Sequence, residues 1–175
     1  RQAAQATLFR ERLAALVAHR TDRLADTDGS QTTACLDLMG GWLRAADFEV
    51  AIHHVMDHPF LIARRIEDSA APTILTYSHG DVVPGMEGRW ADGRDPWTLT
   101  EAQGRFYGRG VADNKGQFLV NLTAFEAVLA AKGRLGLNLI WVVEMGEEIG
   151  SPGLAELCAT QAEALRADLL LASDG

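Results

Sequence analysis

The chain has 175 residues, of which 47% are hydrophobic and 23% are charged, a composition typical of one globular domain with a packed core. Its formal net charge of −8 argues against a nucleic-acid partner, because phosphate groups are bound by basic surfaces. No apolar run is long enough to cross a membrane, so a membrane partner is not expected either. Cys35 and Cys158 are expected to be free thiols in a reducing compartment, which favours the cytoplasm. The chain starts at Arg1, and a targeting segment ahead of it stays an open alternative.

Along the first 70 residues, the hydrophobic pattern predicts two helices followed by two strands. The helices are predicted at residues 3–24 and 32–46, and the strands at residues 48–55 and 60–66. Ser30 or Thr32 is expected to cap the second helix. The histidines of the strand segment, His53, His54 and His58, are interpreted as surface residues, because an extended backbone does not bring them together as metal ligands.

From residue 70 onward, short apolar strands alternate with amphipathic helices. Strands are predicted at residues 73–78, 137–143 and 169–172, helices at 114–132 and 151–160, and a small hairpin at 99–107. The loop at residues 84–98, rich in Gly, Pro, Asp and Trp, is long enough to favour a functional role. The alternation predicts an α/β domain with a mixed, mostly parallel sheet and helices on both of its faces.

Residues 108–116, GRGVADNKG, join the hairpin to the long helix and contain three glycines and one aspartate. So many glycines indicate a tight turn or a close approach to a ligand. Asp113 is interpreted either as the helix cap or as a carboxylate presented to a metal ion, and only the second interpretation explains the glycines on both sides. A dinucleotide-binding fingerprint is disfavoured, because the required position of its third glycine is not filled.

Several polar groups follow a strand or precede a helix at what should be one edge of the sheet. They are His79, Asp113, the pair Glu147 and Glu148, and Asp174. His79, Asp113, Glu148 and Asp174 are spaced by 34, 35 and 26 residues, each about one strand–helix–strand unit, so they can be neighbours in space. One imidazole and several carboxylates suit zinc, or two zinc ions that share a carboxylate.

Asp81 lies two residues after His79, on the same side of an extended backbone. It can therefore accept a hydrogen bond from the ring nitrogen that does not bind metal and so fix the tautomer. The simpler alternatives are a strand-end turn for His79 and Asp81 and a solvated charge pair for the two glutamates. A nucleophilic triad of Ser78, His79 and Asp81 is excluded, because neighbours along one strand cannot converge on one another.

Three ordered motifs carry a resemblance to a known family. SHGDVVP at residues 78–84, YGRGVADNKG at 107–116 and EEIGS at 147–151 resemble the signatures of a family of dinuclear zinc hydrolases. That family includes carnosinase, carboxypeptidase G, aminoacylase and succinyl-diaminopimelate desuccinylase. The resemblance covers roughly residues 70–175 and implies a three-layer zinc-peptidase-like catalytic domain.

The resemblance implies a role for each residue of the predicted site. His79 and Asp174 would bind one metal ion, Asp113 would bridge two ions, and Glu148 would bind the second. Glu147 would be the general base, and Asp81 would orient His79. The peptide bond between Asp113 and Asn114 is expected to be cis, as in the family. The cofactor would be two Zn²⁺ ions per complete site, with Co²⁺ or Mn²⁺ as alternatives.

The sequence also departs from the family pattern. The family has one more metal-binding histidine late in the chain and a separate lid domain that dimerises, and neither is found in residues 1–175. We therefore interpret residues 1–175 as the first part of a catalytic domain that is incomplete at its C-terminus and that forms a homodimer when full length. The expected function is hydrolysis of an amide bond in a dipeptide or an N-acyl amino acid by a metal-bound water. A related zinc aminopeptidase, or an inactive fragment or binding module, are the alternatives.

Overall fold

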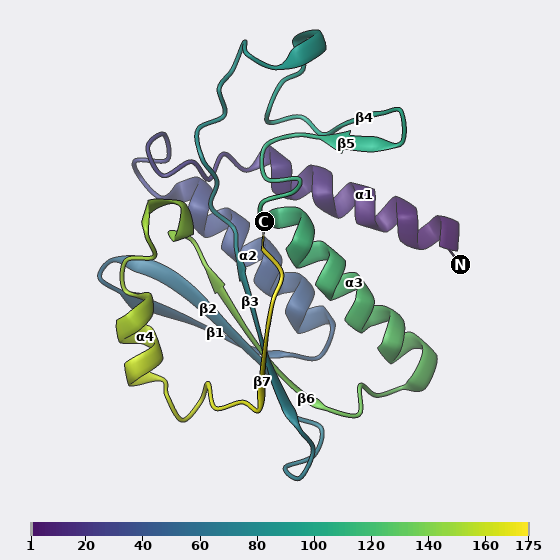
Figure 1. Ribbon diagram of the computed structural model, residues 1–175, viewed down its shortest axis with the longest axis vertical. Helices are drawn as coiled ribbons and strands as arrows, with labels where there is room; N and C mark the ends of the chain where they lie inside the picture. Colours follow the sequence, from purple (N-terminus) through teal and green to yellow (C-terminus); the bar gives the residue numbers. More distant parts are fainter. Residues whose placement is uncertain (1, 175) are drawn as a thin grey trace.

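A five-stranded mixed sheet forms the centre of the protein (Figure 1), and the computed structural model describes residues 2–174. The strands are β1 (Glu49–Val55), β2 (His58–Arg65), β3 (Thr73–His79), β6 (Asn138–Glu144) and β7 (Leu169–Ala172), in the order β1-β2-β6-β3-β7. β1, β2 and β6 pair antiparallel, whereas β6, β3 and β7 pair parallel. The predicted mixed sheet is confirmed, and the carboxyl ends of its three parallel strands meet at one edge.

Helices cover both faces of this sheet, which confirms the predicted three-layer arrangement. They are α1 (Gln2–Ala18), α2 (Ser30–Ala45) and α3 (Lys115–Lys132) on one face and the short α4 (Leu154–Thr160) on the other (Figure 1). Trp141 and Phe118 pack together in the larger core, and Phe60 and Leu157 belong to the smaller core beside α4. Because β6 lies between the two cores, all of its residues are buried. Within residues 2–174, no helix is long and apolar enough to cross a membrane.

The first helix is shorter than its hydrophobic pattern predicts. It ends at Ala18 rather than near residue 24, because the next residues pair with the segment that follows β3. The Thr21 hydroxyl donates to the Gly80 carbonyl at 2.7 Å, and Asp22 forms an isolated parallel bridge with Val82. These long-range hydrogen bonds replace the helical ones, and they fix the backbone immediately after His79.

The second helix begins where it was expected but is capped differently. Gly29, with a φ of 70°, occupies the N-cap position instead of Ser30 or Thr32, and it offers no side-chain hydrogen bond. The carboxylate of Asp26 accepts the backbone N–H groups of Gln31 at 3.1 Å and Thr32 at 2.7 Å. Asp26 therefore satisfies the free N–H groups of the first turn from outside the helix, a role that its sequence position does not reveal.

The long loop after residue 83 is held by its tryptophans. Trp97 is largely buried and donates to the Glu87 carboxylate at 2.6 Å, and Trp90 donates to the Gly85 carbonyl at 2.8 Å. The guanidinium of Arg20 lies over the Trp97 ring, 5.6 Å from its centre, and ties the loop to the segment after α1. The loop contains a short 3₁₀ turn, η1 (Ala91–Gly93), and leads into the hairpin of β4 (Thr100–Ala102) and β5 (Arg105–Tyr107).

Candidate metal centre

Three chain segments deliver polar side chains to the carboxyl edge of the parallel strands. His79 is the last residue of β3, and Asp174 follows β7, the strand that pairs with β3. Asp113 stands just before α3, and Figure 1 shows the C-terminal end of the chain beside the first turn of that helix. The edge therefore collects residues that are far apart in sequence, as the strand-end pattern predicts.

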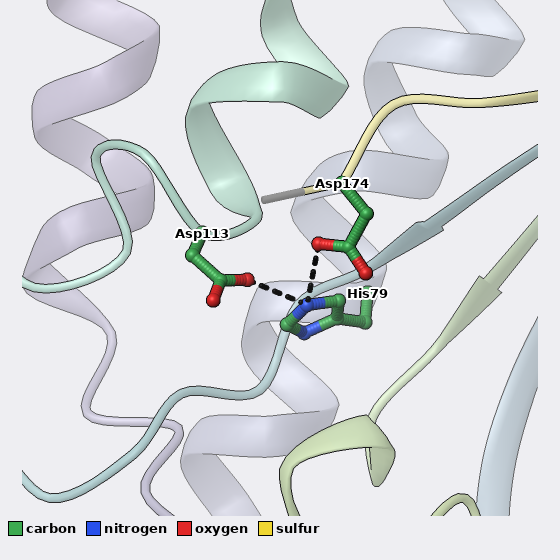
Figure 2. Close-up of side chains that lie close together, drawn as sticks. All are labelled: His79, Asp113 and Asp174. Atoms are coloured by element: carbon green, nitrogen blue, oxygen red, sulfur yellow. Dashed lines mark hydrogen bonds and ion pairs between the residues drawn. The ribbon is translucent and has the colours of Figure 1, made fainter.

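The two aspartates point at the same nitrogen of the imidazole ring (Figure 2). Nε2 of His79 lies 2.9 Å from Oδ1 of Asp113 and 3.7 Å from Oδ1 of Asp174. One ligand atom from each of the three residues lies within 4.8 Å of the others, and we call this group the His79 cluster. The carboxylate of Glu147 also comes within 3.9 Å of Nε2.

The other nitrogen of the His79 ring is committed to a hydrogen bond. Nδ1 lies 3.1 Å from the backbone carbonyl oxygen of Asp81 and 3.3 Å from Oδ1 of the same residue. Because a carbonyl oxygen can only accept, Nδ1 carries the hydrogen and donates it. Nε2 is therefore the nitrogen that is left to coordinate a metal ion.

The electrostatics of the cluster favour a cation. Burial alone would lower the pKa of His79, but the hydrogen bond and charge of Asp81, with the charges of Asp113 and Glu147, raise that pKa to about 9. In the absence of metal, the imidazole is thus protonated at neutral pH and neutralises part of the negative charge around it. A bound divalent cation would take the place of this proton.

Asp81 also makes hydrogen bonds to backbone N–H groups, which the sequence did not predict. Its fully buried carboxylate accepts the backbone N–H of Glu147 at Oδ1, 3.2 Å away, and the N–H of Glu148 at Oδ2, 3.0 Å away. These two N–H groups begin the 3₁₀ turn η2 (Glu147–Ile149) that follows β6. One carboxylate therefore orients the imidazole and also anchors the turn that carries both glutamates.

Asn114 is another residue that sequence reasoning missed. Its side chain is fully buried, and its Oδ1 accepts the backbone N–H of His79 at 3.4 Å. Its Nδ2 donates to the Ser173 carbonyl at 2.7 Å and to Oδ1 of Asp174 at 3.1 Å. Asn114 thus links the ends of β3 and β7 to the start of α3. Its only signal in the sequence is its position next to Asp113, with which it forms the expected cis peptide bond.

The two adjacent glutamates are placed differently. Glu147 approaches His79, as described above, whereas Glu148 does not belong to the group of three described residues whose ligand atoms converge. Burial and the nearby charge of Asp113 raise the pKa of Glu148. Its predicted role as a ligand of a second ion stays a prediction.

The donor set fits a divalent metal ion. One imidazole nitrogen and several carboxylate oxygens are ligands that zinc accepts, and a carboxylate such as that of Asp113 can bridge two ions. The side chains of Asp113 and Asp174 are 51% and 38% exposed, so their oxygens face an open edge where an ion and a substrate can reach them. Without a metal ion, the protonated imidazole of His79 neutralises only part of the negative charge of these carboxylates.

Known families and proteins match this chain in sequence. The family described as Peptidase family M20/M25/M40 matches residues 75–173, which is more than half of the chain. A cysteinylglycine-S-conjugate dipeptidase of Corynebacterium striatum is 43% identical over 107 residues, which cover 60% of this chain and 23% of that protein. An acetylornithine deacetylase of Yersinia pseudotuberculosis is 37% identical over 131 residues, which cover 71% of this chain and 33% of that protein.

A solved structure matches nearly the whole chain. The crystal structure of human carnosine dipeptidase 1 superposes with a TM-score of 0.90 and 28% sequence identity, and the match covers 99% of this chain and 39% of that chain. The match extends the similarity to the first 70 residues, where the sequence motifs are absent. This chain therefore spans about a quarter of the bacterial dipeptidase and well under half of the human enzyme.

Proposed function

Because the chain belongs to peptidase family M20/M25/M40, we propose that it forms part of the catalytic domain of a metal-dependent hydrolase. The reaction is cleavage of an amide bond in a dipeptide or an N-acyl amino acid, since the relatives include a dipeptidase and a deacetylase. The observation that carries the proposal is the convergence of Asp113 and Asp174 on Nε2 of His79. Further support comes from Asp81, which holds the ring with Nε2 facing the aspartates.

Each residue of the site has one role in this proposal. His79, Asp113 and Asp174 would hold one zinc ion, and Asp113 and Glu148 would hold a second. When bound, zinc supplies acidification of a water molecule and polarisation of the substrate carbonyl. Glu147 takes the proton from the attacking water and returns it to the leaving amine. Its carboxylate, 37% exposed and 3.9 Å from Nε2 of His79, is close enough to the cluster for that task.

The coverage of the relatives supports a proposal for the rest of the enzyme. The match reaches 39% of the human dipeptidase chain, so the complete enzyme is expected to contain a further catalytic segment and a lid domain. By resemblance to the family, the further segment supplies one more histidine for the second ion, and the lid domain forms a homodimer and grips the substrate. The free thiols of Cys35 and Cys158 fit an enzyme of the reducing cytoplasm.

The test compares two adjacent substitutions in the complete enzyme. Glu147→Gln should keep both metal ions and lose about 10²–10⁴-fold in kcat, because a general base contributes about that factor. Glu148→Gln should lose affinity for one ion, since a neutral amide is a poorer ligand than a carboxylate, and excess zinc should partly restore its activity. Glu156→Gln, at an exposed position of α4, is the matched control and should change neither quantity.

Metal stoichiometry and turnover are measured side by side for these variants. If Glu147→Gln loses metal while Glu148→Gln retains it, the two roles are exchanged. If His79→Ala leaves the metal content unchanged, the His79 cluster is not the metal site and the proposed function is wrong.

A further inference from the structure

A buried carboxylate with two hydroxyl partners lies near the candidate metal centre and takes no part in it. Glu144, the last residue of β6, is fully buried, and its Oε1 accepts hydrogen bonds from the Tyr77 hydroxyl at 2.6 Å and the Ser151 hydroxyl at 2.9 Å. Its Oε2 is buried and has no hydrogen-bond partner among the described residues. Burial raises the pKa of Glu144, and the two hydroxyl hydrogen bonds oppose that rise. A carboxyl group buried in this way costs stability, so its presence calls for a reason.

The two hydroxyls come from segments that are far apart in the sequence. Tyr77 is on β3, two residues before His79, whereas Ser151 is just beyond η2. Ser151 has a φ of 52°, in the left-handed region that favours glycine. Serine at this position supplies a hydroxyl that glycine would not, and this hydroxyl donates to Glu144.

The turn is closed on itself and clamped at both ends. Within it, Ser151 N–H donates to the Gly146 carbonyl at 2.8 Å and Gly150 N–H donates to the Glu147 carbonyl at 2.8 Å. At its start, the Asp81 carboxylate holds the N–H groups of Glu147 and Glu148. At its end, Ser151 is tied through Glu144 to Tyr77. Both clamps lead back to β3, the strand that carries His79.

We propose that Glu144 is a positioning residue which, through the hydroxyls of Tyr77 and Ser151, fixes the orientation of the Glu147–Glu148 turn relative to His79. Two neighbouring glutamates can carry two different roles only if the backbone between them does not rotate, because a rotation would exchange their directions. The clamp itself is a property of the fold, whereas its consequence for catalysis rests on the proposed function. A buried polar trio with a purely structural role would stabilise the whole chain but would not act selectively on this turn.

The substitution Ser151→Gly distinguishes a positioning role of Glu144 from a purely structural one. Glycine adopts the left-handed backbone of Ser151 more easily than serine does, so the substitution removes the hydroxyl without forcing the chain to move. Gln103→Gly is the matched control, because Gln103 also has a positive φ, 53°, but lies in the β4–β5 hairpin. Tyr77→Phe removes the hydroxyl on the other side of Glu144.

The measurement is amide hydrogen exchange by NMR on the metal-free chain, together with thermal unfolding. In Ser151→Gly, the amides of Glu147, Glu148 and Gly150 should exchange about tenfold faster or more, while the unfolding midpoint changes little, because the relief of the left-handed backbone offsets part of the lost hydrogen bond. Gln103→Gly should leave these amides unchanged. The effects of Ser151→Gly and Tyr77→Phe on exchange should be non-additive in the double variant, because both act through Glu144.

Exchange at Glu147 and Glu148 that equals the wild-type rate in Ser151→Gly would overturn the proposal. So would an acceleration spread evenly over the whole sheet, since that result indicates a structural role alone. A titration with Co²⁺, followed by its visible absorption, then tests the link to the site: the spectrum of Ser151→Gly should differ from that of the wild type. If the wild-type chain binds no Co²⁺ but the exchange results hold, the proposed function fails and the clamp stands.

Discussion

Binding of a divalent cation to the His79 cluster should release about one proton per ion at neutral pH. The surrounding carboxylates raise the pKa of His79 to about 9, so the metal-free imidazole is almost fully protonated at pH 7. A metal ion needs the neutral ring, and it must therefore displace this proton from Nε2. Because the pKa of His79 lies about two units above pH 7, displacing this proton weakens the apparent affinity for the metal ion at pH 7 by about 100-fold, or about 2.7 kcal/mol.

The affinity should consequently rise about tenfold for each unit of pH until the pH approaches the pKa of about 9. Isothermal titration calorimetry with Zn²⁺ at pH 6.5, 7.5 and 8.5, in buffers of different ionisation enthalpy, measures both the affinity and the number of protons released. His54→Gln, at an exposed position of β1, is the control and should leave the slope unchanged. An affinity that does not vary over this range, or the absence of proton release at pH 7, would refute the reasoning that a metal ion displaces a proton from His79.

The raised pKa of His79 also affects the stability of the metal-free chain. The pKa of His79 rises from 6.5 in the unfolded chain to about 9 in the folded one, so the protonated ring stabilises the fold. This contribution, about 3 kcal/mol, is fully present below pH 6.5 and is lost as the pH rises toward 9. Urea unfolding in the presence of a chelator, at pH 6.5 and at pH 9.5, measures the loss. Equal effects of pH on the wild type and on His79→Gln would contradict it.

Two further predictions concern the edge strand and a buried lysine. Leu169, Leu170 and Leu171 of β7 are 58%, 61% and 40% exposed, and β7 pairs only with β3 among the described strands. The 175-residue chain should therefore self-associate, and sedimentation should show Leu170→Lys shifted toward monomer. A wild-type chain that stays monomeric at high concentration would contradict this prediction. Lys115 is fully buried and donates to the carbonyls of Leu16 at 2.9 Å and His19 at 2.8 Å, at the end of α1. Lys115→Met should therefore lower the free energy of unfolding by about 2–4 kcal/mol, whereas Lys132→Met, at an exposed position of α3, should change it by less than about 0.5 kcal/mol in urea unfolding.

The sequence by itself determined the elements and the edge at which the site forms. Residues 137–143 are apolar at nearly every position, which predicts a strand covered on both faces, and β6 lies between the two cores. His79 and Asp174 stand at the ends of parallel strands, and such ends share one edge whatever the details of packing. The hydrophobic pattern of a strand and the position of a residue at its end are local features of the chain, so they can be recognised in a single sequence.

Only the tertiary structure decided which groups hold that edge in place. The end of α1 at Ala18, the capping of α2 by Asp26 and the link of Asn114 to His79 and Asp174 all depend on partners that no local pattern specifies. The same is true of the Glu144 contact with Tyr77, which joins residues 67 positions apart. A buried hydrogen bond is set by where two strand ends or loops meet in space, and the sequence around either partner carries no period that reveals the other.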